Sequence, residues 1–346
     1  MSKKTVKYLL NVLLLVVIIA GALLILLRDQ SLSDIFEVIS EAGKGWLLAG
    51  AAFVFVHVCS ESVILNILFR TFDSPVALFK CIFLSCTGFF YSAITPSASG
   101  GQPVQVYYMT KFGVDVLIGT LCSMLVTICY KLALLSLLVV FLFTKGGTVL
   151  SAISQVPLFF LYGLVGNTLF MGFLCVAVFK PSFAYSIISG LIKFGGRIKL
   201  LKHPEKTLAK AIGSLRQYEH CAAYVKKHLS LIPRILAITF VQRLAYFSVC
   251  YMVYRSFGLS GTDIFEFFAL QVVLALAVDA LPLPGAAGAN EGVFTLLFKR
   301  IFGETVVFSG LLLYRGLTYF FLMFATGIIT LLGHILIMRR KESVGC

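Results

Sequence analysis

Six ionisable side chains lie inside long apolar stretches of the sequence, where lipid or protein rather than water should surround them. They are Glu61, Lys131, Arg243, Asp279, Glu291 and Arg315. A charge at the centre of a bilayer costs from about 2.5 kcal/mol to several times that value, so such residues normally face a partner or a water-filled cavity. These six residues are therefore the first candidates for a binding site.

The chemistry that these side chains suit is the recognition of a charged ligand. Guanidinium groups at Arg243 and Arg315 suit bidentate capture of a phosphodiester, and Lys131 adds a point charge. Asp279 and Glu291 could hold an ammonium group or carry a proton. The alternative interpretation is that the six residues form three internal ion pairs that only lock helices together.

Two short segments rich in glycine and proline, residues 95–103 and 283–291, interrupt two of the apolar stretches at matching places. An unsatisfied backbone amide costs several kcal/mol in a bilayer, so a broken helix persists at membrane depth only where protein or water surrounds it. Gln102 and Asn290 add amide side chains that suit a ligand. The glycines have an alternative interpretation as close helix-packing positions. The predicted break positions are Pro96, Gly100, Gly101, Pro103, Pro284, Gly285 and Gly288.

The elements that must position these residues are membrane helices. The chain is 59% hydrophobic and 13% charged, and its mean hydropathy is +0.98, far from the soluble average. Apolar runs long enough to cross about 30 Å of hydrocarbon cover residues 8–27, 46–69, 114–143, 159–179, 235–254 and 308–338. The segments 76–109 and 264–302 each carry one break. We therefore expect an all-α polytopic integral membrane protein with about six full spans plus two re-entrant or broken-helix hairpins.

An internal repeat relates the two halves of the chain, because several landmarks recur in the same order at offsets of 184 to 190 residues. The pairs are 69–72 with 254–257, 111–113 with 300–303, and Tyr130-Lys131 with Tyr314-Arg315. The repeats then cover 46–143 and 231–338. Inverted repeats with broken helices at the midplane are a transporter architecture.

The distribution of Lys and Arg predicts the orientation in the membrane. Residues 180–234 hold eleven basic residues against two acidic ones, and further basic residues lie near both termini. We therefore expect both termini and this loop in the cytoplasm, which makes the two repeats inverted. The net charge of +14 then indicates contact with anionic lipid headgroups rather than nucleic acid. Within the loop, the pattern over 206–227 suits a basic amphipathic helix at the membrane surface, or alternatively a solvated connector.

These predictions divide the chain into five parts. They are an N-terminal anchor helix with an external interfacial segment (1–45), a first repeat (46–143), a span with the basic loop (144–230), a second repeat (231–338) and a cytoplasmic tail (339–346). The nine cysteines and five histidines form no metal-ligand or disulfide pattern, and we expect no cofactor. No ATP-binding glycine-rich loop with Lys-Ser or Lys-Thr is present in the sequence.

The residues around the breaks resemble a known family. Residues 92–103 and 107–109, with 281–285, 290–292 and 313–315, closely resemble the bacterial lysylphosphatidylglycerol synthase transmembrane family. That family includes the flippase half of the multiple peptide resistance factor, and the resemblance covers nearly the whole chain. It implies a flippase-like domain that moves a polar or aminoacylated lipid, such as lysyl-phosphatidylglycerol, across the bacterial cytoplasmic membrane. Such movement contributes to cationic peptide resistance.

Other functions remain open at this point. Only residues 339–346 follow the last predicted span, too few for an aminoacyl-transfer domain, so we do not expect phosphatidylglycerol lysyltransferase activity from this chain. The chain could instead be the membrane subunit of a lysylphosphatidylglycerol synthase with a soluble aminoacyltransferase partner, or a transporter of polyprenyl-linked lipids. A membrane enzyme could use Glu61, Asp279 or Glu291 as an acid or base. The sequence shows no nucleophile and base at a suitable spacing, so we assign no catalytic residue.

Overall fold

The computed structural model describes residues 37, 40–180, 189–190 and 230–344, and every regular element in these ranges is helical. The predicted first span over 8–27 and the predicted amphipathic helix of the basic loop lie outside the described residues. The helices are α3 (Lys44–Thr71), α4 (Leu78–Ile94), α5 (Gly101–Lys111), α6 (Val116–Thr144), α7 (Gly146–Gln155), α8 (Pro157–Phe179), α11 (Leu231–Ser256), α12 (Ile264–Val278), α13 (Ala289–Phe302), α14 (Val307–Arg315), the π-helix η1 (Gly316–Phe321) and α15 (Leu322–Val344).

Five of these helical segments in the described ranges are long and apolar enough to cross a membrane. They are α3, α6, α8, α11 and the continuous run Val307–Ile337, which joins α14, η1 and α15. Each matches one of the predicted spans. The described chain is therefore an all-helical, multi-pass membrane protein.

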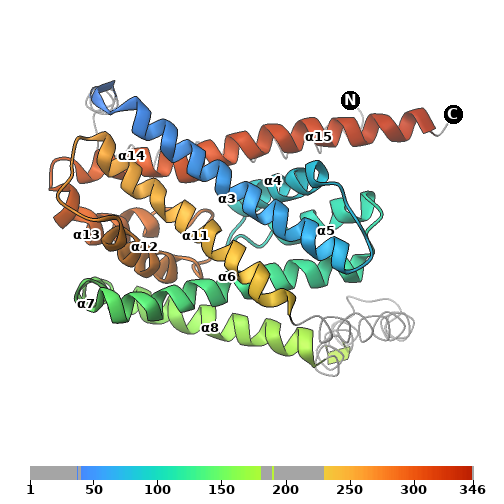
Figure 1. The fold of residues 1–346 in the computed structure, drawn as a ribbon, viewed down its shortest axis with the longest axis horizontal. Coiled ribbons are helices and arrows are strands. Elements are labelled where there is room, and N and C mark those ends of the chain that lie inside the picture. Colours follow the sequence, from blue (N-terminus) through green and yellow to red (C-terminus); the bar gives the residue numbers. More distant parts are fainter. Residues whose placement is uncertain (1–36, 38–39, 181–188, 191–229, 345–346) are drawn as a thin grey trace.

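The two segments that carry breaks each form a pair of short helices. The first pair is α4 and α5, and the second is α12 and α13. Figure 1 shows α4 and α5 toward one end of the long helices and α12 and α13 toward the other end. This placement agrees with hairpins that enter from opposite sides, although the inversion across a membrane stays a prediction.

The two breaks have the same local backbone. After the proline of each break, two residues adopt left-handed conformations: Ser97 and Ala98 have φ of 50° and 53°, and Gly285 and Ala286 have φ of 56° and 51°. Left-handed backbone costs non-glycine residues about 1–2 kcal/mol each, so the surroundings must hold both breaks in this shape. The shared conformation agrees with the internal repeat predicted from the sequence, which stays a prediction.

The breaks also contact each other. Pro96 and Pro284 form an isolated antiparallel bridge. The Tyr319 hydroxyl donates to the carbonyl of Ala93, 3.1 Å away, and the ring of Tyr319 lies where a Cβ on Gly285 would be. Gly285 thus provides both the left-handed backbone and the space for this ring.

Helices α3 and α11 run side by side between the two hairpins (Figure 1). Gln242 Nε2 donates to the backbone oxygen of His57 at 3.2 Å, and His57 Nδ1 lies 3.3 Å from the Gln242 backbone oxygen. These residues are 185 positions apart, within the range of the repeat offsets. In the predicted repeat these two residues are equivalent positions, and equivalent positions contact each other only near the axis that relates two repeats.

Helix α8 packs closely against α12 because Gly163 has no side chain. A Cβ at this position would overlap the carbonyl oxygen of Leu276. We predict that Gly163→Ala pushes α8 away from α12 and lowers the free energy of unfolding by about 1–3 kcal/mol, the usual cost of overpacking. Equilibrium unfolding in mixed micelles with increasing SDS would measure this change.

The matched control is Gly172→Ala on the same helix, where a Cβ meets no atom within 4 Å. An equal loss of stability in both variants would show that the close approach at Gly163 is not the cause.

Candidate functional site

A cavity of about 1490 Å³ lies where the two breaks meet, and residues from both repeats line it. Helices α3, α4, α5, α6, α8, α11, α12 and α14 all contribute to its walls. Six of the eight residues that the sequence predicts for ligand binding line this cavity: Glu61, Gln102, Lys131, Arg243, Asp279 and Asn290.

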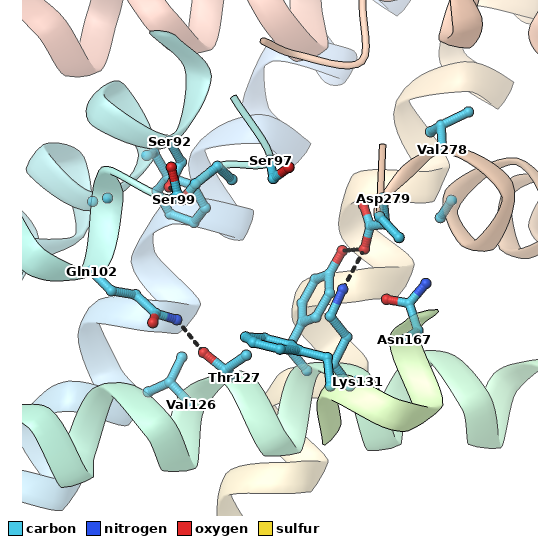
Figure 2. Close-up of a pocket in the computed structure, with 18 of the residues that line it drawn as sticks. Ser92, Ser97, Ser99, Gln102, Val126, Thr127, Lys131, Asn167, Val278 and Asp279 are labelled. Atoms are coloured by element: carbon cyan, nitrogen blue, oxygen red, sulfur yellow. Dashed lines mark hydrogen bonds and ion pairs between the residues drawn. The ribbon is translucent and has the colours of Figure 1, made fainter. Parts of the chain in front are cut away.

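An ion pair on the cavity wall joins the two halves of the chain. Lys131 Nζ on α6 lies 3.0 Å from Asp279 Oδ2, at the C-terminal end of α12. The Tyr130 hydroxyl donates to the same oxygen at 2.6 Å. Figure 2 shows both donors converging on Asp279. The charge of Asp279 is therefore satisfied by the first repeat.

Arg243 on α11 is buried, with 6% of its surface exposed, and faces a different environment. Its guanidinium carbon lies 4.3 Å from the ring centre of Tyr130 and 5.5 Å from that of Tyr246, and Nη2 lies 3.1 Å from His57 Nδ1. Among the described residues, no carboxylate oxygen lies within 4.0 Å of its nitrogens. In the described part of the chain, no hydrogen-bond partner lies near its Nε atom. Aromatic faces partly compensate a cation, but a buried guanidinium without a counter-ion is costly.

Glu61 on α3 is the second cavity charge without an opposite charge beside it. Gln105 Nε2 donates to Glu61 Oε1 at 3.0 Å and lies 3.2 Å from the backbone oxygen of Leu84. Within the described part of the chain, no basic nitrogen comes within 4.0 Å of this carboxylate. Glu61 is therefore held at short range by side-chain amides, and Arg243 interacts with it from beyond 4.0 Å.

Uncharged polar groups form the side of the cavity next to the first break. Gln102 Nε2 donates to the hydroxyl of Thr127, and Ser92 Oγ donates to the Ala98 backbone oxygen at 3.4 Å. Figure 2 shows Ser92, Ser99 and Gln102 on one side and the ion pair with Asn167 on the other. The ion pair and these uncharged polar groups thus lie on different sides of the cavity.

The remaining two predicted ligand residues, Glu291 and Arg315, do not line the cavity. Arg315 Nε lies 2.8 Å from Glu291 Oε1, and Arg315 Nη2 donates to the Gly285 backbone oxygen at 3.1 Å. Glu291 Oε2 in turn accepts from the backbone nitrogen of Gly288. Together these contacts hold the second break in shape.

The six predicted charges therefore separate into two kinds. Four of them form two ion pairs, as the alternative interpretation in the sequence proposed, whereas Glu61 and Arg243 are not paired within 4.0 Å. The sequence did not indicate that the Tyr130 hydroxyl donates to Asp279, or that His57 lies beside Arg243. Tyr130 was visible only as a repeat landmark, and His57 only as an isolated histidine in an apolar run. Within the described ranges, no three His, Cys, Asp or Glu side chains are grouped to hold a metal ion.

A comparison with known protein families gives a match over most of the chain. The family described as the lysylphosphatidylglycerol synthase TM region matches residues 12–326, which include both breaks and the whole lining of the cavity. The chain belongs to this family. Its members are membrane domains associated with lysylphosphatidylglycerol synthesis or flipping. The family predicted from the sequence is therefore confirmed. No curated protein matches the chain.

The ion pair between Lys131 and Asp279 generates a stability prediction. Lys131→Met leaves the half-buried Asp279 carboxylate without its cation, and we expect the free energy of unfolding to fall by about 3 kcal/mol, at the low end for a buried pair. Adding Asp279→Asn to this variant removes the unpaired charge and should restore much of the loss. A double-mutant cycle of SDS unfolding measures the coupling.

The control for this cycle is the surface pair of Lys299 and Glu304, 2.9 Å apart and exposed to solvent. Lys299→Met should cost little, because solvent screens such pairs. Equal losses for the two lysine variants would contradict a special role for the cavity ion pair.

Proposed function

We propose that this chain is a flippase-like transporter that moves a polar lipid with a phosphate in its headgroup between the leaflets of the bacterial cytoplasmic membrane. The observation that carries the proposal is the buried Arg243 guanidinium on the wall of a large cavity, where no carboxylate of the described residues lies within 4.0 Å of its nitrogens. An anionic ligand would supply the missing charge.

A phosphodiester fits the chemistry around Arg243. Guanidinium binds phosphate oxygens in a bidentate manner, and such charge-assisted hydrogen bonds are about twice as strong as neutral ones. Tyr130 and Tyr246 keep the guanidinium plane in place by cation–π contact. The volume of about 1490 Å³ exceeds the roughly 300–1,000 Å³ of ordinary ligand pockets, so a headgroup can enter together with water.

The lipid tails would remain in the bilayer beside α8. Leu161 and Leu169 line the cavity, yet 58% and 69% of their surfaces are exposed on the apolar exterior of the helix. Because α8 lines the cavity and also has an apolar surface, the headgroup can lie in the cavity while the acyl chains stay in the bilayer. This arrangement suits a lipid better than a soluble solute.

The transport cycle that we propose is a rocking of one repeat against the other. The contacts between equivalent positions, His57 with Gln242 and Pro96 with Pro284, lie near the axis and would serve as the pivot. In this mechanism the repeats are inverted, the termini are cytoplasmic and the basic loop contacts anionic lipid headgroups. Arg315 and Glu291 act as positioning residues that hold the second break.

Moving an aminoacylated lipid such as lysyl-phosphatidylglycerol outward would lower the negative charge of the cell surface and so contribute to resistance against cationic peptides. The family description also favours a second function, in which the chain is the membrane subunit of a lysylphosphatidylglycerol synthase. That role requires a soluble aminoacyltransferase partner. Polyprenyl-linked lipids are a further class of substrate that the same transport mechanism would carry.

The decisive experiment is leaflet exchange in proteoliposomes that contain only this chain. We expect exchange of a labelled phosphate-bearing lipid among lysyl-phosphatidylglycerol, phosphatidylglycerol and a polyprenyl-phosphate sugar. Arg243→Gln should slow that exchange by about 10- to 100-fold, because hydrogen bonds to a charged group contribute about 1.5–3 kcal/mol.

The matched control is Arg255→Gln, which changes an arginine on the same helix that does not line the cavity. Equal exchange by the wild type and Arg243→Gln would remove Arg243 from the mechanism. No exchange of any lipid by the wild type, together with copurification of an aminoacyltransferase, would favour the synthase subunit.

A further inference from the structure

The cavity has a group of uncharged polar side chains whose role the phosphate site at Arg243 does not explain. Figure 2 shows Ser92, Ser99 and Gln102 together, away from the ion pair, and the Gln102 amide directed to Thr127. All four of these residues line the cavity. A headgroup that binds Arg243 through its phosphate would therefore meet uncharged hydrogen-bonding groups elsewhere in the same cavity.

The protons of these side chains are already used within the protein. Gln102 Nε2 donates to the Thr127 hydroxyl, and that hydroxyl donates to a backbone oxygen of its own helix at 3.0 Å. The hydroxyls of Ser92 and Ser97 donate to backbone oxygens at 3.4 Å. Hydroxyl and amide oxygens keep lone pairs after their protons are used. These side chains therefore offer mainly acceptors to a ligand, and a ligand that binds them must donate.

Asn290 has the same need at the second break. It lines the cavity, its Oδ1 atom is buried, and among the described residues no hydrogen-bond donor reaches that atom. A buried acceptor without a partner is costly and rare in native proteins. Its position on the cavity wall therefore indicates that a donor on a ligand completes it.

The two amides occupy matching places in the chain. Gln102 is the second residue of α5, and Asn290 is the second residue of α13. They are 188 positions apart, within the range of the offsets between the sequence landmarks. Each half of the chain therefore contributes one amide to the cavity, at the end of its own break.

The chemistry of these groups selects the kind of donor. Phosphate oxygens at neutral pH are acceptors and cannot pair with other acceptors. An ammonium group can donate, but its transfer to uncharged groups in a cavity is costly. A hydroxyl group is uncharged and both donates and accepts, as an amide side chain does. Hydroxyl groups therefore match this part of the cavity best.

We propose that Gln102 and Asn290 form a subsite for an uncharged polyhydroxyl group that is attached to the phosphate of the transported lipid. The oxygens of Ser92, Ser97 and Ser99 add acceptors to this subsite. The inference rests on the proposed transport function and names the class of its headgroup. A sugar on a polyprenyl phosphate and the glycerol of phosphatidylglycerol both have this chemistry. A headgroup without hydroxyls leaves Asn290 Oδ1 without a partner, so it is transported more slowly.

The test compares phosphodiester lipids that differ only in their hydroxyls, in proteoliposomes of the full chain. One pair is phosphatidylglycerol with phosphatidylpropanol, and the other is a polyprenyl-phosphate hexose with polyprenyl methyl phosphate. In at least one pair, the wild type should exchange the hydroxyl-bearing lipid at least about 5-fold faster, which corresponds to one or two neutral hydrogen bonds. The pair that shows the preference identifies the source of the hydroxyls. Equal rates within both pairs would overturn the proposal.

The protein side of the test uses Gln102→Leu and Asn290→Leu, which keep the approximate size and remove the amide. The readout is the ratio of the two rates within a pair, because this ratio does not depend on how much of a variant is folded. We expect each variant to lower the ratio and the double variant to bring it close to 1. A wild-type ratio in the double variant contradicts the subsite.

Gln155→Leu is the matched amide control, since Gln155 is exposed on α7 and lies outside the cavity lining. This variant should keep the wild-type ratio, and an equal fall in the ratio would show that the effect is not specific to the cavity. Failure of the two proposals can be told apart. Exchange without a preference for hydroxyls refutes only the subsite, whereas a wild-type chain that exchanges no lipid refutes the transport function and the subsite with it.

Discussion

The antiparallel contact between Pro96 and Pro284 joins the two breaks in the apolar helices. Broken backbone in a membrane needs protein or water around it, and here each break lies against the other. The cavity, its polar lining and the ends of α4, α5, α12 and α13 are all arranged around this contact. Tyr319, which touches both breaks, and Arg315, which bonds to the second, keep the strained backbone in place.

The distribution of charge follows from the same constraint. A membrane protein can retain a buried charge when an opposite charge, an aromatic face or a ligand compensates it. Glu291 and Arg315 compensate each other behind the second break, and Lys131 and Asp279 do so across the cavity. Within the described residues, Arg243 lies against aromatic faces and an imidazole and forms no ion pair within 4.0 Å, and it lies on the cavity wall, where the proposed anionic headgroup would bind.

Much of this fold could be predicted from the sequence, because hydropathy and helix breakers act locally. The five described spans coincide with apolar runs of the sequence, and both breaks coincide with clusters of Gly and Pro. The break motifs also indicate the family. The partners of the charges could not be predicted, because they depend on which helices cross. Nothing local shows that Lys131 reaches Asp279 whereas Arg315, its repeat equivalent, reaches Glu291. His57 was missed for the same reason: its role depends entirely on its contact with α11.

The π-helix η1 follows Arg315, whereas Lys131 lies within the regular helix α6. Arg315 ends the α-helix α14 directly before this π-helix and pairs with Glu291 in its own half of the chain, whereas Lys131 pairs with Asp279 in the other half. In an alternating-access cycle, two identical halves would make the inward-facing and outward-facing states equal in free energy. Unequal halves remove this degeneracy. In the proposed transport cycle, the inward-facing and outward-facing states of this chain would therefore differ in free energy even without an energy source.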